Sequence, residues 1–338
     1  MYYIDRKKTF LKDFDESSQI TYSKIGKIKA LFWLISFLII ILILMVPSIV
    51  LNIALSIFAV ATNTVEIINE MSTNPKNPML SQWINVTLST GINILSFFIY
   101  IKLIEKRPFK TIGLKSNKKL IKYLKGVLIA ILMQLIYFSI ILISGFGEIL
   151  SEPIYASYSF GISAIGPVLM FLIAFIIQGA SEEVAIRGWL LPVLSKHYKP
   201  VTAIIISSLF FGILHALNPN VAILPIINLI LYGIFASLYA LYDDGLWGIF
   251  AQHSIWNWFM GNVLGLPVSG MIIGNSSIIE TKLTGPTWIT GGDFGPEGGI
   301  IVTIIFTVSS LILIKLLINK GIIVPKNKNS TKNIEETA

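Results

Sequence analysis

Apolar runs long enough to cross a lipid bilayer recur along this chain and constrain its fold more than any other feature. A transmembrane helix needs roughly 20 predominantly apolar residues, and about eight segments approach that length. The candidate spans are approximately residues 30–60, 80–104, 122–145, 165–195, 200–217, 221–242, 245–265 and 299–319. Only 13% of the residues are charged, against about 25% in a typical soluble domain. We therefore predict an all-α polytopic membrane protein of about eight transmembrane helices, with its functional site inside the helical bundle.

The polar segments divide the chain into three regions. Residues 1–29 are a basic lead, residues 30–320 are the transmembrane helical domain, and residues 321–338 are a polar tail. Residues 284–299 are rich in Gly and Pro, so we expect this segment to be non-helical. The chain has no cysteine, which excludes disulfides and thiolate metal sites.

The distribution of Lys and Arg predicts how the chain crosses the membrane. The basic segments are the lead, residues 102–125, the turn at Lys196 and Lys199, and the tail. The alternate loops, residues 61–79, 146–164 and 266–298, hold only Lys76 and Lys282. Cytoplasmic loops carry the excess of basic residues, so we predict a multi-pass protein of the cell membrane with both termini in the cytoplasm. Because the basic residues flank apolar spans, the net charge of +8 indicates contact with membrane lipid and not with nucleic acid.

A cluster of charges interrupts the fourth span. The stretch "QGASEEVAIRGWLLP" places Glu182, Glu183 and Arg187 where a charge can cost several kcal/mol. The fourth and fifth spans form a hairpin that turns near Tyr198, and Glu182 and His215 lie about equally far from that turn. At a constant rise per residue, both side chains reach the same depth. His253 and Asn257, counted from the turn between the sixth and seventh spans, fall at a similar depth.

The spacing of these residues also selects helix faces. Residues four apart share a face, so Glu183 and Arg187 are predicted to form a salt bridge. His253 and Asn257 share a face in the same way. Glu182 lies about 100° around the helix from Glu183, which leaves its carboxylate free to face a cavity.

This combination of side chains favours hydrolysis. A carboxylate and an imidazole, Glu182 and His215, can orient and deprotonate a water, while His253 and Asn257 can donate hydrogen bonds to an oxyanion. Phe211, four residues before His215, is expected to pack around the site. No Ser or Cys nucleophile stands beside a base. By residue type alone, Glu182, His215 and His253 could also bind zinc, and each polar residue could instead serve only helix packing.

The same residues resemble the motifs of a known family. "EEVAIR" fits the pattern EExxxR, "FGILH" fits FxxxH and "HSIWN" fits HxxxN, in this order on successive spans. Together they resemble the CPBP family of intramembrane proteases, also called the Abi or CAAX-protease family, over about residues 100–320. "RPFKTIGL" and "TGGDFGPEGG" look like that family too.

The resemblance implies an intramembrane endopeptidase that cleaves a membrane-associated protein or peptide. It implies that Glu182 and His215 activate water and that His253 and Asn257 form the oxyanion hole, with Glu183, Arg187 and Phe211 in support. The family has been labelled metalloprotease. A glutamate mechanism without a cofactor fits these residues better, with zinc as the alternative.

Other functions compete with proteolysis. Richness in Ile, Lys and Asn favours a bacterial member, and bacterial relatives are linked to bacteriocin immunity. A non-catalytic immunity or scaffold protein of the same fold is therefore the alternative, although a scaffold has no need of all four polar residues. A transporter with a buried proton-carrying Glu would be expected to show an inverted repeat, and the sequence has none.

The predicted topology can be tested with reporter fusions. Reporters placed after Lys125 and after Asn275 should report opposite sides of the membrane, because a basic segment and a loop nearly free of Lys and Arg carry them. Finding both reporters on one side would overturn the eight-span arrangement.

Overall fold

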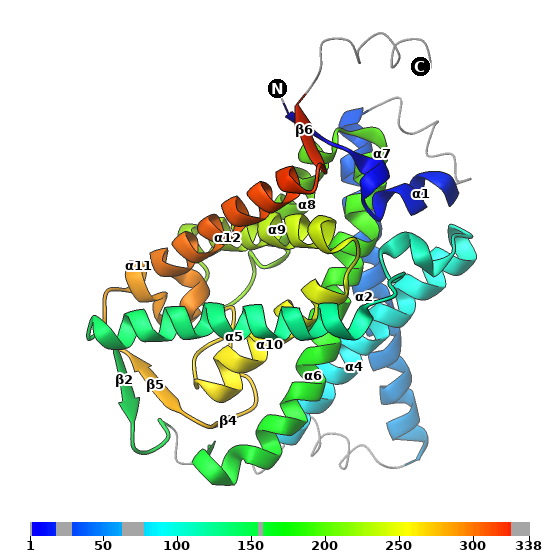
Figure 1. Cartoon of the computed structure of the whole chain (residues 1–338). Helices are drawn as coiled ribbons and strands as arrows, with labels where there is room; N and C mark the ends of the chain where they lie inside the picture. Colours follow the sequence, from blue (N-terminus) through cyan, green and yellow to red (C-terminus); the bar gives the residue numbers. More distant parts are fainter. Residues whose placement is uncertain (1, 18–28, 63–77, 155–157, 326–338) are drawn as a thin grey trace.

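The computed structural model describes residues 2–17, 29–62, 78–154 and 158–325, and these residues form a helical bundle (Figure 1). Its main helices are α2 (Lys29–Ala61), α4 (Pro78–Ile99), α5 (Lys119–Ile143), α6 (Ile165–Glu183), α7 (Leu191–His197), α8 (Pro200–Leu214), α9 (Ile223–Asp243), α10 (Trp247–Trp258) and α12 (Ile300–Asn319). The prediction of an all-α polytopic membrane fold is confirmed.

Six helical segments in the described part of the chain are long and apolar enough to cross a membrane. They are α2, α4, α5, α6 with its continuation through α7, α9 and α12. The other two predicted spans correspond to the shorter helices α8 and α10. The number of eight crossings therefore stays a prediction.

Helix α8 ends inside the apolar run from which a span to residue 217 was predicted. It has 15 residues, a length of about 22 Å at the usual rise, whereas the hydrocarbon core is about 30 Å thick. The helix stops at Leu214, with His215 as its C-cap. Asn218, Pro219 and Asn220 follow, and Asn220 has a φ of 57°, so the chain turns immediately after His215.

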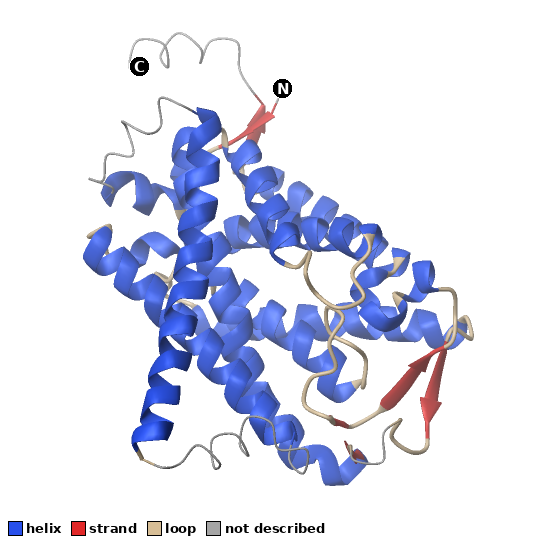
Figure 2. Ribbon diagram, turned by 180° about the vertical axis from the view of Figure 1, so that it is seen from behind, coloured by secondary structure: helices blue, strands red, loops and turns tan. Residues whose placement is uncertain are grey.

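Three small two-stranded sheets join segments that are distant in the sequence. β1 (Tyr2–Ile4) pairs antiparallel with β6 (Ile323–Pro325), which brings the two described ends of the chain together. β2 (Gly147–Leu150) pairs antiparallel with β5 (Glu280–Leu283), and β3 (Ser159–Phe160) pairs parallel with β4 (Ser276–Ser277). The β1–β6 and β2–β5 pairs lie at opposite ends of the bundle (Figures 1 and 2).

Two terminal or loop segments are more ordered than their composition suggests. Within the lead, helix α1 (Leu11–Ser17) buries Leu11 and Phe14 against the bundle. The segment 284–299, predicted to be non-helical, contains the one-turn helix α11 (Thr287–Thr290) and two short 3-10 turns. The expectation for this loop was wrong because Gly and Pro here end short turns instead of excluding them. The polar tail from Lys326 lies outside the described residues.

Close helix packing fixes α10, the helix that carries two of the predicted site residues. It packs against both α5 and α6. On the α5 side, a Cβ added at Gly126 would lie 2.0 Å from the carbonyl oxygen of Gly248. On the α6 side, a Cβ at Gly179 would lie 2.8 Å from the backbone nitrogen of Ser254. Only glycine allows these backbones to approach so closely, so α10 is held tightly on two sides.

This packing predicts that two Gly→Ala substitutions differ greatly in their effect on the free energy of unfolding. Gly126→Ala should destabilise the protein by about 1–3 kcal/mol, the usual cost of overpacking, because a helix carbonyl cannot move aside as a side chain can. Gly166→Ala in α6 is the matched control, since its Cβ would meet nothing within 4 Å. Thermal unfolding of the two purified variants in detergent measures the difference. Equal unfolding midpoints would contradict the close approach of α5 and α10.

Candidate active site

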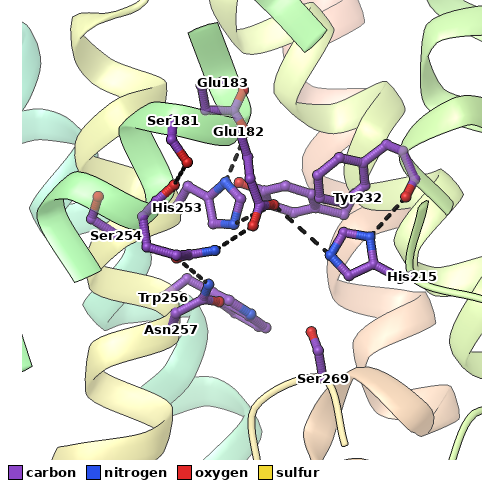
Figure 3. A network of polar contacts seen from close by, with 12 residues as sticks. Ser181, Glu182, Glu183, His215, Tyr232, His253, Ser254, Trp256, Asn257 and Ser269 are labelled. Carbon is purple, nitrogen blue, oxygen red and sulfur yellow. Dashed lines mark hydrogen bonds and ion pairs between the residues drawn. The ribbon is translucent and has the colours of Figure 1, made fainter. Parts of the chain in front are cut away.

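A cavity of about 870 Å³ lies within the bundle and collects most of the residues singled out in the sequence. Its walls come from α4, α6, α8, α9, α10 and residues 268–273. Five of the predicted site residues line it, namely Glu182, Phe211, His215, His253 and Asn257. Glu183 and Arg187 lie behind this lining with fully buried side chains. Figure 3 shows how Glu182, His215, His253 and Asn257 face one another.

Glu183 connects two parts of the site. Its Oε1 accepts a hydrogen bond of 2.9 Å from Nη1 of Arg187, the salt bridge predicted from the spacing. The same oxygen lies 2.8 Å from Nδ1 of His253, a contact that the sequence analysis did not foresee. Because an ionised carboxylate only accepts, Nδ1 of His253 donates. Glu183 therefore holds Arg187 and also orients the imidazole on α10.

Arg187 is held from three directions. It lies in a π-helical stretch, Val184–Leu190, that continues α6. Besides the bond to Glu183, its Nη2 donates to the carbonyl of Gly233 on α9 at 3.3 Å, and its guanidinium carbon lies 4.7 Å from the ring centre of Phe211. These contacts surround a cation that would otherwise be very costly inside an apolar bundle.

The two imidazoles present the same nitrogen to one carboxylate oxygen. Nδ1 of His215 lies 2.8 Å from the backbone carbonyl of Phe211 and donates to it, because a carbonyl only accepts. Phe211 thus orients His215 through its backbone while its ring packs on Arg187. Nε2 of His215 and Nε2 of His253 each lie 3.8 Å from Oε2 of Glu182. This separation exceeds a direct hydrogen bond.

The two oxygens of Glu182 differ in their surroundings. Oε1 accepts a 2.5 Å hydrogen bond from Nε2 of Gln178, whose own Oε1 accepts from Nδ2 of Asn257 at 3.1 Å. Oε2 is shielded from solvent and accepts no hydrogen bond from any described residue. Gln178 escaped the sequence analysis, although it stands four residues before Glu182 and so shares its helix face.

A second buried carboxylate closes the cavity from the Gly-rich segment. Glu297 accepts through Oε1 from Nε1 of Trp256 at 3.1 Å. Its Oε2 accepts from the backbone nitrogen and the hydroxyl of Ser269, at 2.9 and 2.6 Å. Glu297 thereby ties the loop around Ser269 to the residue that precedes Asn257. The only sequence signal was an acid within a Gly-rich loop, which does not reveal a partner on α10.

The possible zinc ligands can be compared with this geometry. Among the described residues, no group of three His, Asp or Glu side chains is placed to hold a metal ion. The imidazole orientations do not distinguish a zinc site from a metal-free site, because histidines that bind metals are also fixed through the other ring nitrogen. As placed, Glu182, His215 and His253 do not fit a metal, and we derive no step through one.

Comparison with known proteins identifies the segment that carries this geometry. Residues 164–259 match the family model described as type II CAAX prenyl endopeptidase Rce1-like. Over this segment the chain is similar to the Rce1-like CAAX endopeptidase family. This finding confirms the resemblance seen in the sequence motifs, while a bacterial source stays a prediction. No curated protein and no solved structure matches the chain. The matched segment contains all seven predicted site residues, whereas α4 and Glu297 lie outside it.

The different surroundings of the two adjacent carboxylates predict different effects on stability. Arg187→Ala leaves Glu183 buried without its cation, a change that typically costs about 3–5 kcal/mol. Glu182→Gln keeps the shape of a side chain that faces the cavity and should leave the thermal unfolding midpoint close to that of the wild type. Similar losses of folded yield in both variants would show that the two carboxylates do not have separate roles.

Proposed function

We propose that this chain is an intramembrane endopeptidase in which Glu182 and His215 activate a water for attack on a peptide carbonyl. The similarity of residues 164–259 to the Rce1-like family supports endopeptidase activity in the membrane in general. The observation that carries the specific mechanism is the placement of Glu182 Oε2. This oxygen is shielded from solvent and lacks a hydrogen-bond donor among the described residues. The Nε2 atoms of His215, at the end of α8, and of His253, on α10, each lie 3.8 Å from it.

Hydrogen-bond accounting assigns a proton to this site. With Nδ1 of both histidines donating, a neutral imidazole presents Nε2 as an acceptor. Glu182 Oε2 and two such nitrogens would be three acceptors around one point, and a water has only two protons to donate. One of the three must therefore carry a proton of its own.

We assign that proton to His253 on the ground of charge balance. Glu182 and Glu183 contribute two negative charges, and Arg187 contributes one positive charge. A protonated His253, in contact with Glu183 and facing Glu182, makes this set of four side chains electrically neutral, which an apolar interior favours. His215, whose Nδ1 donates to a backbone carbonyl, presents Nε2 to the cavity as the base.

The reaction then follows from these positions. The water donates one hydrogen bond to Glu182 and one to His215, and its oxygen attacks the carbonyl carbon of the substrate. One water proton passes to Nε2 of His215 or to Glu182 as the new C–O bond forms. The C–N bond then breaks, and the same proton moves to the departing amide nitrogen. The products are a carboxyl group and an amine.

The N–H groups of His253 and Asn257 support a role in stabilising the oxyanion. Protonated Nε2 of His253 can donate to it. The amide of Asn257 has two N–H groups, of which one is used by Gln178 and the other remains for the substrate oxygen. Donors that are already fixed before the reaction need little rearrangement as charge develops.

The function can be tested with purified protein in detergent micelles and a library of fluorescence-quenched peptides. We expect the wild type to cleave members of the library and Glu182→Gln to lose this activity while remaining folded. Glu148→Gln is the matched control, because Glu148 is an exposed residue of β2, outside the cavity. Equal cleavage by Glu182→Gln would refute the mechanism. A wild type without any peptidase activity would favour the non-catalytic scaffold or immunity function.

The metal-free mechanism makes a separate prediction. Activity should survive EDTA and phenanthroline, and the purified protein should contain far less than one zinc per chain. Asn257→Ala and His253→Ala should each slow turnover by about 10²–10³, the scale for one lost oxyanion donor, without changing the metal content. Stoichiometric zinc whose removal abolishes activity and whose return restores it would establish the zinc alternative.

A further inference from the structure

One face of α4 contributes an unusual wall to the cavity. This helix lies outside the residues matched by the Rce1-like family model. The α4 residues that line the cavity are Gln82, Asn85, Val86, Ser89, Thr90 and Asn93. Their spacing places them on a single helix face, and all but Val86 carry an amide or hydroxyl group. We call this set the α4 polar face.

Polar residues in membrane helices often hold neighbouring helices together through hydrogen bonds. Two residues of the α4 polar face form no such hydrogen bond with the described residues. The hydroxyls of Ser89 and Thr90 donate to carbonyls of their own helix. Asn85 and Asn93, in contrast, have no side-chain hydrogen bond to any described residue, and Oδ1 of Asn93 is buried. Their amides face the cavity, so a molecule inside the cavity is the partner they can bind.

Contacts between α4 and α6 place this face relative to Glu182. Nε1 of Trp83 donates to the carbonyl of Met170 at 2.8 Å, and a Cβ at Gly91 would meet Ile177 at 3.9 Å. The two helices therefore run parallel with a nearly constant offset. Asn93 falls at the level of the Gln178–Glu182 turn of α6. The polar face extends from there toward the β2–β5 end of the bundle.

The other end of the polar face meets the loop that closes the cavity. Oε1 of Gln82 accepts a 2.8 Å hydrogen bond from the backbone nitrogen of Gly274. From Gln82 to Asn93 the helix rises about 16 Å. An extended chain advances about 3.3 Å per residue, so about five extended residues match this length.

The charge of the cavity narrows the class of ligand. Among the described lining residues there is no Lys or Arg, and the acids are Glu182 and Glu297. An anionic lipid headgroup or a terminal carboxylate would find no Lys or Arg side chain here. Amide and hydroxyl side chains instead match the alternating donors and acceptors of a peptide main chain.

We infer that the α4 polar face holds about five residues of the substrate, on one side of the scissile bond, as an extended main chain. This inference rests on the proposed endopeptidase function. Recognition of this kind depends on backbone N–H and C=O groups and tolerates varied uncharged side chains. It also requires that a helical substrate segment unwinds before cleavage, since helical N–H and C=O groups are already paired.

An N-methyl scan of a cleaved peptide tests this inference. One peptide that the wild type cleaves is selected from the quenched-peptide library, and each backbone amide is methylated in turn, which removes one donor and leaves the side chains unchanged. We expect kcat/KM to fall about three- to tenfold for each hydrogen bond lost, at alternate positions within about five residues on one side of the scissile bond. A change confined to the bonds next to the cleavage site would overturn the inference.

Variants of α4 supply the second arm. In Asn85→Leu and Asn93→Leu, the unmodified peptide should be cleaved with a raised KM, and methylation at the matching position should cause no further loss. Ser96→Ala is the control, because Ser96 lies on α4 outside the cavity lining and donates to its own helix. If methylation lowers kcat/KM as much in the Asn→Leu variants as in the wild type, the inference is refuted. An unchanged KM in both variants would refute it as well. Absence of all cleavage by the wild type would instead refute the endopeptidase function itself.

Discussion

The site depends first on the buried carboxylate of Glu183. Its side chain has no exposed surface, and a single oxygen receives both the guanidinium of Arg187 and the imidazole of His253. A carboxylate in this position is tolerated only because it is paired. The same pairing determines which nitrogen of His253 faces the cavity, so one ion pair sets the protonation pattern on which the proposed chemistry rests. Glu182, the preceding residue, points into the cavity.

The helices of the bundle hold the residues around this ion pair in fixed positions. Close approach at Gly126 and Gly179 holds α10 between α5 and α6, and α8 ends at the point where His215 enters the cavity. Glu297 ties the Ser269 loop to Trp256, next to Asn257 in sequence. Each donor or acceptor in the site is thus oriented by a neighbour before any substrate binds, which is the condition for efficient electrostatic catalysis.

The sequence predicts the parts of this arrangement that follow from regular helices. Constant rise and the four-residue repeat placed Glu182 beside His215 and paired Glu183 with Arg187. They could not show that His253 also contacts Glu183, because that contact depends on how α6 and α10 cross. The end of α8 at Leu214 lies within an apolar run without a strong stop signal. The sequence also gives no sign of the roles of Gln178, Glu297 and the α4 polar face. These are common polar residues, and only tertiary packing decides that they face the cavity.

The most direct test of the account is to see what lies between Glu182, His215 and His253. Crystals of the purified protein, at a resolution that shows ordered water, should be measured on both sides of the zinc absorption edge. The account predicts a peak of water size within hydrogen-bonding distance of Glu182 Oε2 and His215 Nε2, without anomalous signal. An anomalous zinc peak bonded to all three side chains would contradict it.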